Sequence, residues 1–562
     1  MTRPHRIAAL PLMLTAAAAG QTFTVGALEN RLLENQTINA VNANILGSLT
    51  VGSDGLLDVS NLFDVRGSLI MRTGGEIDGV RSFKTFGGSE TSMSGQCRAT
   101  VEEFRHEGLL EMGGVARLQI STGFENRSGS VLRLQDQARI ERIGASGRDP
   151  FFRNDARVEA LSGFIENFDV FQTSASGETI VGGGTGIGRI AVLEYRNLGV
   201  TRLDSNGTVR AARFENESGA ELVVQPGGRV SLGQFAAGPF ANRGSVLVTG
   251  GRVDNVTLAD TFAGSTTTVQ DGGVMLVFRY TNAGLTTIDS GGRIETGQTF
   301  IRPAGEVRVG PGGTLRGTNG MFVDDGATLA LDGGTVDVVS NFLDVSGEML
   351  VTGDAQVLSI GAGGLVLTGG DARIASVGDA TLEGTIFGQG SIFGSDAPIT
   401  LEGSVAPGLA SSLLTVGTIE WIGDVSLGSA AELVIDVLDL SSHDVIAHRT
   451  DTATLGGTLK VALGADYTPT DGDAFDIVTS SGSLDGRFTG IDAPELGDNL
   501  FFTIDYTGSA ARLRVVPAPA GAALLGVAGV LAGSRRRPCY AGTGSIRTRS
   551  ARPRSSRTPG RV

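Results

Sequence analysis

The sequence predicts an all-β fold, a right-handed parallel β-helix, on three observations. Glycine supplies 85 of the 562 residues, which is about twice its average use in globular proteins. Short alternating strands recur between glycine turns, and amphipathic runs of helical length are absent. A unit of about 20 residues repeats from about residue 21 to residue 400, and a period of that length is typical of a solenoid.

The repeat unit is an aromatic residue, an Asn two positions later, a glycine, an alternating strand and a glycine turn. It is clearest at residues 124–134, 214–228, 240–251 and 280–292, with weaker copies beginning at Phe104 and Tyr195. Strands this short need neighbours, which a solenoid supplies by stacking coils about 4.8 Å apart. We therefore expect Phe124, Phe214 and Phe240 to occupy equivalent corners of successive or nearby coils, with the Asn side chains binding turn backbone groups. The alternative, a row of antiparallel sandwiches, requires hairpin signals about every 8–12 residues without a longer period.

Glycine clusters are expected at the corners of the coils, where positive φ is needed. The pairs Gly312-Gly313, Gly333-Gly334 and Gly369-Gly370 fit this role. The run at residues 182–188 resembles a phosphate-binding loop, but its glycines do not fit the dinucleotide pattern and no Lys-Ser or Lys-Thr pair follows. We interpret it as another glycine corner.

The N-terminus predicts export. Arg3, His5 and Arg6 precede a 13-residue apolar stretch at residues 7–19, which is too short to span a membrane and has the length of a signal-peptide core. Small residues before Gln21 suit signal peptidase, so residues 1–20 are assigned as a signal peptide. The alternative is an N-terminal membrane anchor.

Charge excludes one class of partner. The formal net charge is −15, but residues 535–562 carry nine arginines and no acid, and two more arginines lie in the first six residues. Without these eleven positive charges, residues 7–534 carry −26. A body this acidic repels phosphate backbones, so no nucleic-acid partner is expected.

Cysteine and histidine are too few for a disulfide framework or a zinc site. The two cysteines, Cys97 and Cys539, lie more than four hundred residues apart, and the chain has only 4 histidines. We expect no metal and no cofactor, and we interpret Cys97 as a small buried thiol.

No residue is assigned a catalytic role. Asp324-Asp325 is the one adjacent acid pair of note in the repeat region, and the following Gly326 favours a turn. His106 is the one histidine between residues 21 and 400, and His443-Asp444 is interpreted as the solvated start of a strand. The alternative function is a secreted carbohydrate-active β-helix enzyme, a polysaccharide lyase or hydrolase, which would need several carboxylates and an Arg converging in one groove.

The pattern changes near residue 400. Residues 403–408 contain a Pro-Gly turn, and the strands at 431–436, 453–459 and 472–478 follow in order. This series resembles the C-terminal β module of autotransporter-like passenger proteins, and the resemblance implies that residues 401–514 cap the repeat region. The amphipathic barrel strands of a true autotransporter do not follow.

The C-terminus resembles a PEP-CTERM sorting signal. That resemblance rests on a Pro-x-Pro motif, the small and apolar residues 521–533, and a basic stop. The residues that carry the motif and the stop are Pro517, Ala518, Pro519, Arg535, Arg536 and Arg537. It implies a transient membrane helix and processing by an exosortase-type protease, although Ala518 stands where the family has Glu and 25 residues follow the arginines. A plain C-terminal membrane anchor with cytoplasmic arginines is the alternative.

Together these features divide the chain into five parts: a signal peptide at 1–20, β-helix repeats at 21–400, a capping module at 401–514, a sorting signal with its helix at 515–537, and a disordered basic tail at 538–562. They predict an exported bacterial protein of the outer cell surface or extracellular matrix, non-enzymatic and structural or adhesive. Its expected partners are the export machinery and signal peptidase, an exosortase-type protease, a surface polysaccharide, and the membrane through the C-terminal helix.

Overall fold

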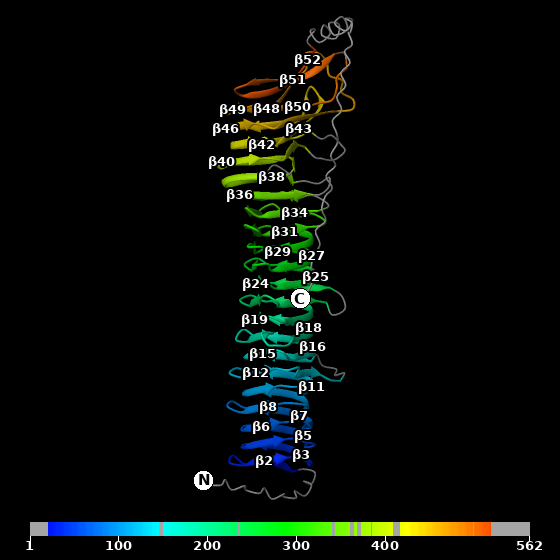
Figure 1. The fold of residues 1–562 in the computed structure, drawn as a ribbon, viewed down its shortest axis with the longest axis vertical. Coiled ribbons are helices and arrows are strands. Elements are labelled where there is room, and N and C mark those ends of the chain that lie inside the picture. Colours follow the sequence, from blue (N-terminus) through cyan, green and yellow to red (C-terminus); the bar gives the residue numbers. More distant parts are fainter. Residues whose placement is uncertain are drawn as a thin grey trace, which may run out of the picture.

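The protein forms one straight rod in which strands stack from the N-terminal end, blue in Figure 1, to the C-terminal end in orange. The computed structural model describes residues 21–144, 150–233, 237–339, 343–359, 365–367, 373–383, 385–408, 416–497 and 499–518. No helix occurs in these ranges, and nearly all strand pairs are parallel. The predicted all-β parallel solenoid is confirmed. The general rule that crossovers between parallel strands are right-handed favours the predicted right-handed sense.

Each coil has three faces, which we number in chain order. Face 1 is made of short strands that pair from coil to coil, as β2 pairs with β4 and β4 with β6. Its strands are β2 (Asn30–Leu33), β4 (Ser48–Val51), β6 (Ser68–Met71), β8 (Glu90–Met93), β10 (Leu109–Met112), β12 (Val131–Leu134), β15 (Arg157–Ala160), β17 (Glu178–Val181), β19 (Val200–Leu203), β21 (Glu221–Val224), β24 (Ser245–Thr249), β26 (Thr266–Gln270), β28 (Leu285–Ile288), β30 (Glu306–Val309) and β33 (Thr328–Asp332).

Faces 2 and 3 are mostly the two halves of one long strand that bends where the register shifts. These long strands are β3 (Thr37–Ile45), β5 (Leu56–Val65), β7 (Glu76–Thr85), β9 (Arg98–His106), β11 (Arg117–Asn126), β16 (Phe164–Thr173), β18 (Gly188–Asn197), β20 (Gly207–Asn216), β25 (Arg252–Thr261), β27 (Val274–Asn282) and β29 (Arg293–Ile301). In four coils two strands replace the long one: β13 (Arg139–Arg142) with β14 (Phe151–Asn154), β22 (Arg229–Leu232) with β23 (Gly238–Asn242), β31 (Thr314–Gly317) with β32 (Met321–Val323), and β34 (Thr335–Val338) with β35 (Leu343–Val345). Strand β1 (Thr22–Val25) begins face 3.

From residue 348 the continuous strand joins faces 1 and 2 instead. Strands of this kind are β36 (Glu348–Ser359), β38 (Arg373–Glu383), β40 (Gly390–Leu401) and β42 (Thr418–Leu427). Face 3 continues as β37 (Leu365–Leu367), β39 (Thr385–Gly388), β41 (Ser404–Pro407), β43 (Glu432–Asp439), β47 (Thr458–Leu463) and β50 (Gly490–Asp492). The last strands of faces 1 and 2 are β45 (Val445–His448), β48 (Ala474–Ser480), β46 (Thr452–Leu455) and β49 (Ser483–Gly486).

The parallel ladders therefore run past residue 400 without a change of topology, since β40 pairs with β42 and β41 with β43 in the same sense as earlier coils. The antiparallel hairpin of β51 (Leu500–Thr507) and β52 (Ala510–Pro517) ends the solenoid, with β52 pairing along β48. A further short strand, β44 (Ser442–His443), also runs antiparallel, to β43. The β51–β52 hairpin pairs along the edge of β48 that a further coil would otherwise occupy. Covering that edge is the role expected of the capping module.

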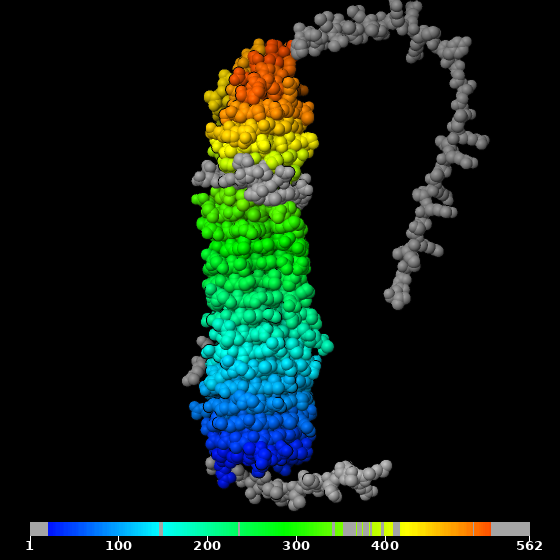
Figure 2. Space-filling model, turned by 90° about the vertical axis from the view of Figure 1, so that its left-hand side faces the viewer, coloured from blue at the N-terminus to red at the C-terminus, as the bar shows by residue number. Residues whose placement is uncertain are grey.

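Side chains alternate between the inside and the outside of the rod along each strand, and the inward ones fill one continuous core. In β4, Leu49 and Val51 are fully buried while Ser48 and Thr50 remain partly accessible. Figure 2 shows the coils from outside as stacked ridges of even width. At the corners, Gly312 has φ +74, and a Cβ on Gly313 would collide with the carbonyl oxygen of Ile288. The predicted glycine corners are confirmed here and at the run beginning with Gly182, whose φ is +88, and residues 369–370 lie outside the described ranges.

Candidate functional site

An aromatic column fills the interior behind face 3. Phe104 is the register partner of Phe124, and Phe214 is the partner of Phe240. The column comprises Phe63, Phe83, Phe104, Phe124, Phe152, Phe171, Tyr195, Phe214 and Phe240. Consecutive ring centroids lie between 4.5 and 5.2 Å apart. The predicted equivalence of Phe124, Phe214 and Phe240 is confirmed. Their predicted place at corners was wrong, because the three rings project from within strands β11, β20 and β23 into the core.

A column of buried Asn side chains runs beside the aromatic column. Asn126 donates from Nδ2 to Oδ1 of Asn154 at 2.8 Å and to the carbonyl oxygen of Arg157 at 3.1 Å. Asn216 repeats this with Asn242 and with the carbonyl oxygen of Ser245, both at 2.9 Å. These two Asn side chains thus each bind the Asn at the same position of the next coil and a backbone carbonyl at the start of the next face 1 strand, whereas Asn154 and Asn242 donate to the hydroxyls of Thr179 and Thr267. The predicted role of Asn in satisfying backbone groups is confirmed.

His106 occupies the Asn position in its own coil, since it pairs in register with Asn126. Thr85 Oγ1 lies 2.7 Å from its Nδ1, and the carbonyl oxygen of Val131 lies 3.0 Å from its Nε2. Burial lowers the pKa of His106 to about 4, so the ring is neutral at physiological pH. It is a structural member of the polar column and has no access to solvent.

Charged residues on the outer surface of the rod form rows of ion pairs, which we call ion-pair ladders, that connect neighbouring coils. Four carboxylates that are almost fully buried each bind two arginines of different coils, and these are Glu159, Glu166, Glu215 and Asp254. Glu159, for example, binds Arg133 at 2.7 Å and Arg157 at 2.6 Å. Burial acts to raise the pKa of Glu159, but the hydrogen bonds from both arginines outweigh it and hold that pKa below its usual range. These ladders link neighbouring coils along the surface.

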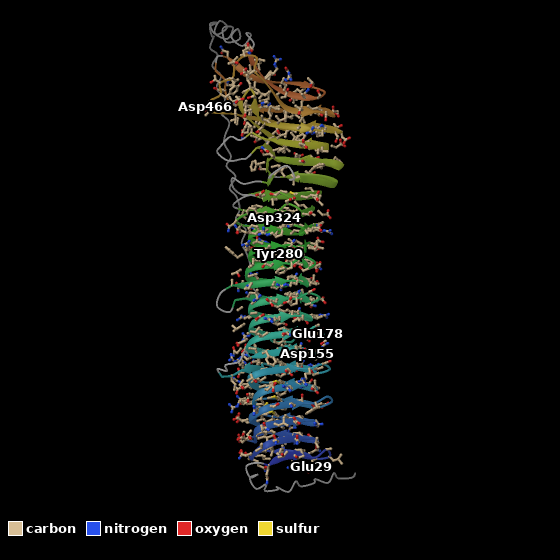
Figure 3. All side chains as sticks on the ribbon, turned by 180° about the vertical axis from the view of Figure 1, so that it is seen from behind. Glu29, Asp155, Glu178, Tyr280, Asp324 and Asp466 are labelled. Carbon is tan, nitrogen blue, oxygen red and sulfur yellow. The ribbon has the colours of Figure 1, made fainter. Side chains whose placement is uncertain are left out.

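The acid pair singled out in the sequence lies in a turn, as predicted. Asp324 follows β32 and binds Arg302 at 2.9 Å, Asp325 is exposed, and Gly326 has φ +72. Asp324 is labelled in the upper half of the rod in Figure 3. Across the ranges the structure describes, no group of three or more His, Cys, Asp or Glu side chains is placed to hold a metal ion. Cys97 is a free buried thiol whose pKa burial raises to about 11.

The capping region holds a buried acid that sequence analysis misplaced. Asp444 is 1% exposed, so its interpretation as a solvated strand start was wrong. Its Oδ1 accepts the N–H of Gly417 at 2.7 Å, and its Oδ2 accepts the N–H of Asp436 at 2.9 Å. The pKa of Asp444 is raised to about 7, mainly by burial and in addition by the neighbouring Asp436 carboxylate, while the two N–H groups act to lower it. An Asp can be buried here because backbone donors from two other segments satisfy it.

The predicted sorting residues fall at the limit of the described chain. Pro517 ends β52, and the N–H of Ala518 donates to the carbonyl oxygen of Asn499 at 2.6 Å. The segment proposed at 515–537 therefore begins inside the last strand of the cap. Pro519, Arg535, Arg536 and Arg537 lie outside the described residues, as do residues 1–20, which the sequence predicts to be a signal peptide. Within the described ranges, no helix is long and apolar enough to cross a membrane.

Comparison with known proteins gives likenesses to solved structures alone. No family model matches the sequence, and no curated protein matches it. A solved structure described as the TibC-catalysed hyper-glycosylated TibA55-350 fragment, from an autotransporter passenger, is similar over 66% of this chain and 100% of its own. The sequence identity is 12% and the TM-score is 0.28, and a likeness at this level carries no conclusion about function.

Proposed function

We propose that the protein is an exported protein of the bacterial outer surface or extracellular matrix, and that its solenoid acts as a structural and adhesive rod without enzymatic activity. The observation that carries the proposal is the uninterrupted stack of coils bound together inside and out. Asn and aromatic columns join the coils within, and arginine–carboxylate pairs join them at the surface. Such a stack is suited to holding its two ends apart and to presenting a long side-chain surface.

Export and release are the second part of the proposal. The basic and apolar residues 1–20 support secretion through a signal peptide, and Pro517-Ala518-Pro519 followed by the arginines at 535–537 supports recognition by an exosortase-type protease. Strand β52 ends at Pro517, so a cut after Ala518 keeps the capping hairpin whole. The apolar residues 520–533 would serve as the transient membrane helix.

The test of the non-enzymatic assignment is an activity assay on a chain from Gln21 to Ala518. We expect it to cleave neither polyuronates nor neutral glycans, with or without calcium, because Asp324 binds Arg302 in a turn and Asp325 points to solvent. Cells that display the chain should nevertheless attach to a surface to which cells lacking the chain do not attach. Reproducible turnover that disappears in the double variant Asp324→Asn, Asp325→Asn would show that the protein is a carbohydrate-active enzyme.

A further inference from the structure

One edge of the rod carries turns that alternate in length. This edge, the corner from face 3 to face 1, has two-residue turns at 107–108, 155–156, 198–199, 243–244 and 283–284, and four-residue turns between them at 127–130, 174–177, 217–220, 262–265 and 302–305. Longer turns reach farther from the rod than shorter ones. We call this corner the notched edge, because each short turn forms the floor between two longer ones. The repeat along it is two coils, or about 9–10 Å.

The notch floored by residues 155–156 is open. Its walls are Glu125, Arg127 and Ser128 on one side and Ser174, Ala175 and Ser176 on the other, and Arg153 and Asp155 complete the lining. The cavity measures about 690 Å³. Asp155 is labelled in Figure 3, one coil below Glu178 on the same side of the rod. By contrast, Arg243 occupies the notch at its own turn, where it stacks on Phe262 at 4.3 Å and binds Glu217 at 3.5 Å.

The charges in the open notch are already matched. Arg127 binds Glu125 and Glu107, both at 3.0 Å, and Arg153 binds Asp155 at 2.9 Å. An anionic ligand would therefore find no free cation among the residues that line it. The hydroxyl groups of Ser128, Ser174 and Ser176 add neutral polar groups to the lining. Ser176 Oγ already donates to the carbonyl oxygen of Asp155 at 3.1 Å and lies 3.4 Å from Ser174 Oγ, so it can still accept a hydrogen bond from a ligand. The lining is hydrogen-bonding in character and close to neutral in charge.

We propose that this notch binds a short stretch of a neutral polysaccharide, whose hydroxyl groups hydrogen-bond to Asp155, Arg153 and the wall serines. Sugar hydroxyls both donate and accept, so they can bind paired carboxylates and guanidinium groups without separating the ion pairs. A peptide adding to the sheet would need a free strand edge, and the notch is floored by a turn. The proposal rests on the adhesive function above and gives that function a site and a ligand class.

The test compares two tryptophan variants of the full chain. Ser176→Trp fills the notch from its wall, and Ser205→Trp places the same side chain on an exposed turn at another corner, between β19 and β20. The probes are hexasaccharides of β-1,4-linked glucose, mannose and xylose, with hexagalacturonate as the anionic counterpart, and binding is measured by titration calorimetry. We expect at least one neutral probe to bind the wild-type chain. Its Kd should rise about tenfold or more in Ser176→Trp and remain unchanged in Ser205→Trp.

Two results would overturn the inference: absence of binding to every neutral probe, or equal affinity in the two variants. Binding of hexagalacturonate alone, weakened by salt, would assign the notch to an acidic ligand and also reject the proposal. Different outcomes test the adhesive function and the binding site. If cells displaying the Ser176→Trp chain attach as well as wild type, the notch is not the adhesive site although adhesion itself stands. If the notch binds glycan but displaying cells do not attach, the proposed function is wrong while the site remains.

Discussion

Asn197 donates a hydrogen bond from Nδ2 to Oδ1 of Asn216 at 2.8 Å, although 19 residues separate them in sequence. Both side chains are completely buried. Asn197 Nδ2 also donates to the carbonyl oxygen of Glu221 at 2.8 Å, and Thr201 Oγ1 donates to its Oδ1 at 3.0 Å. One amide thus joins two coils and closes the turn between faces, which is why Asn recurs at this place in the sequence.

Replacing Asn216 tests the polar column. Asn216→Ala removes the side-chain donor of the Ser245 carbonyl oxygen, and it takes one hydrogen bond each from the side-chain amides of Asn197 and Asn242 in a dry interior. We expect a loss of about 2–4 kcal/mol in the free energy of unfolding, since each buried unsatisfied group costs about 1–3 kcal/mol. Urea denaturation measures it. Asn61→Ala removes an exposed Asn–Asn bond and should change stability little, so an equal loss in both variants would argue against the column.

Replacing Phe214 tests the aromatic column. Its ring stacks between Tyr195 and Phe240 at centroid distances of 4.9 and 5.2 Å. Phe214→Ala opens a cavity and removes both contacts, so a loss of about 3–5 kcal/mol is expected. Phe214→Leu keeps most of the volume and should lose less. If thermal unfolding gave no loss for Phe214→Leu, ring stacking would be contributing nothing beyond bulk.

Acid should weaken the coils around His106. Its pKa is about 4 in the folded chain against 6.5 when exposed, so between these values the unfolded chain binds a proton that the folded chain does not. Stability is therefore lost as the pH falls from about 6.5 to about 4. His106→Asn supplies the side chain found at the same place in the next coil and should reduce this loss. The denaturation midpoint, measured near pH 5 and near pH 8, checks it, and an unchanged acid response would contradict the assignment.

The cap should respond to pH in the opposite direction. The pKa of Asp444 is about 7 in the folded chain against 3.8 when exposed, so the folded state keeps a proton that the unfolded state releases. Stability of the cap is then highest at low pH and is lost as the pH rises from about 4 to about 7. Asp436→Asn removes the facing carboxylate and should make this change smaller, while Asp485→Asn, on the exposed part of β49, should leave it unchanged. Hydrogen exchange of the β45 and β48 amides reports the difference. Equal protection near pH 5 and near pH 8 in the wild-type chain would reject it.

Sequence analysis predicted the features that repeat. The spacing of Phe214 and Asn216 follows directly from stacking, because a side chain that must meet its own copy in the next coil recurs at the coil period. Gly312 was predictable because few other residues adopt its φ. In both cases the physical requirement is local or periodic, so it leaves a pattern in one sequence.

The residues that sequence analysis missed depend on what lies one coil away. In the sequence, Glu159 stands at an alternate position of its strand, where an exposed acid is expected. In the structure it is buried, because Arg133 and Arg157 flank it in space and pair with its carboxylate. Asp444 reads as a polar residue before a strand, and the N–H of Gly417 that satisfies it comes from a distant segment. The notched edge did leave a signal, since the spacer between the Asn position and the next strand alternates between two and four residues. Comparing the lengths of these spacers from one repeat to the next would have revealed the notched edge.

The most direct test of the account is to locate the two ends of the mature protein in the surface fraction by mass spectrometry. The account predicts a first residue at Gln21 and a last residue near Pro517 or Ala518, which leaves β52 and the capping hairpin complete. Peptides from residues 1–20 and from the arginine-rich residues 538–562 should then be absent from that fraction. Recovery of tryptic peptides from 538–562 on exported protein, or of the whole chain inside the cell only, would contradict it.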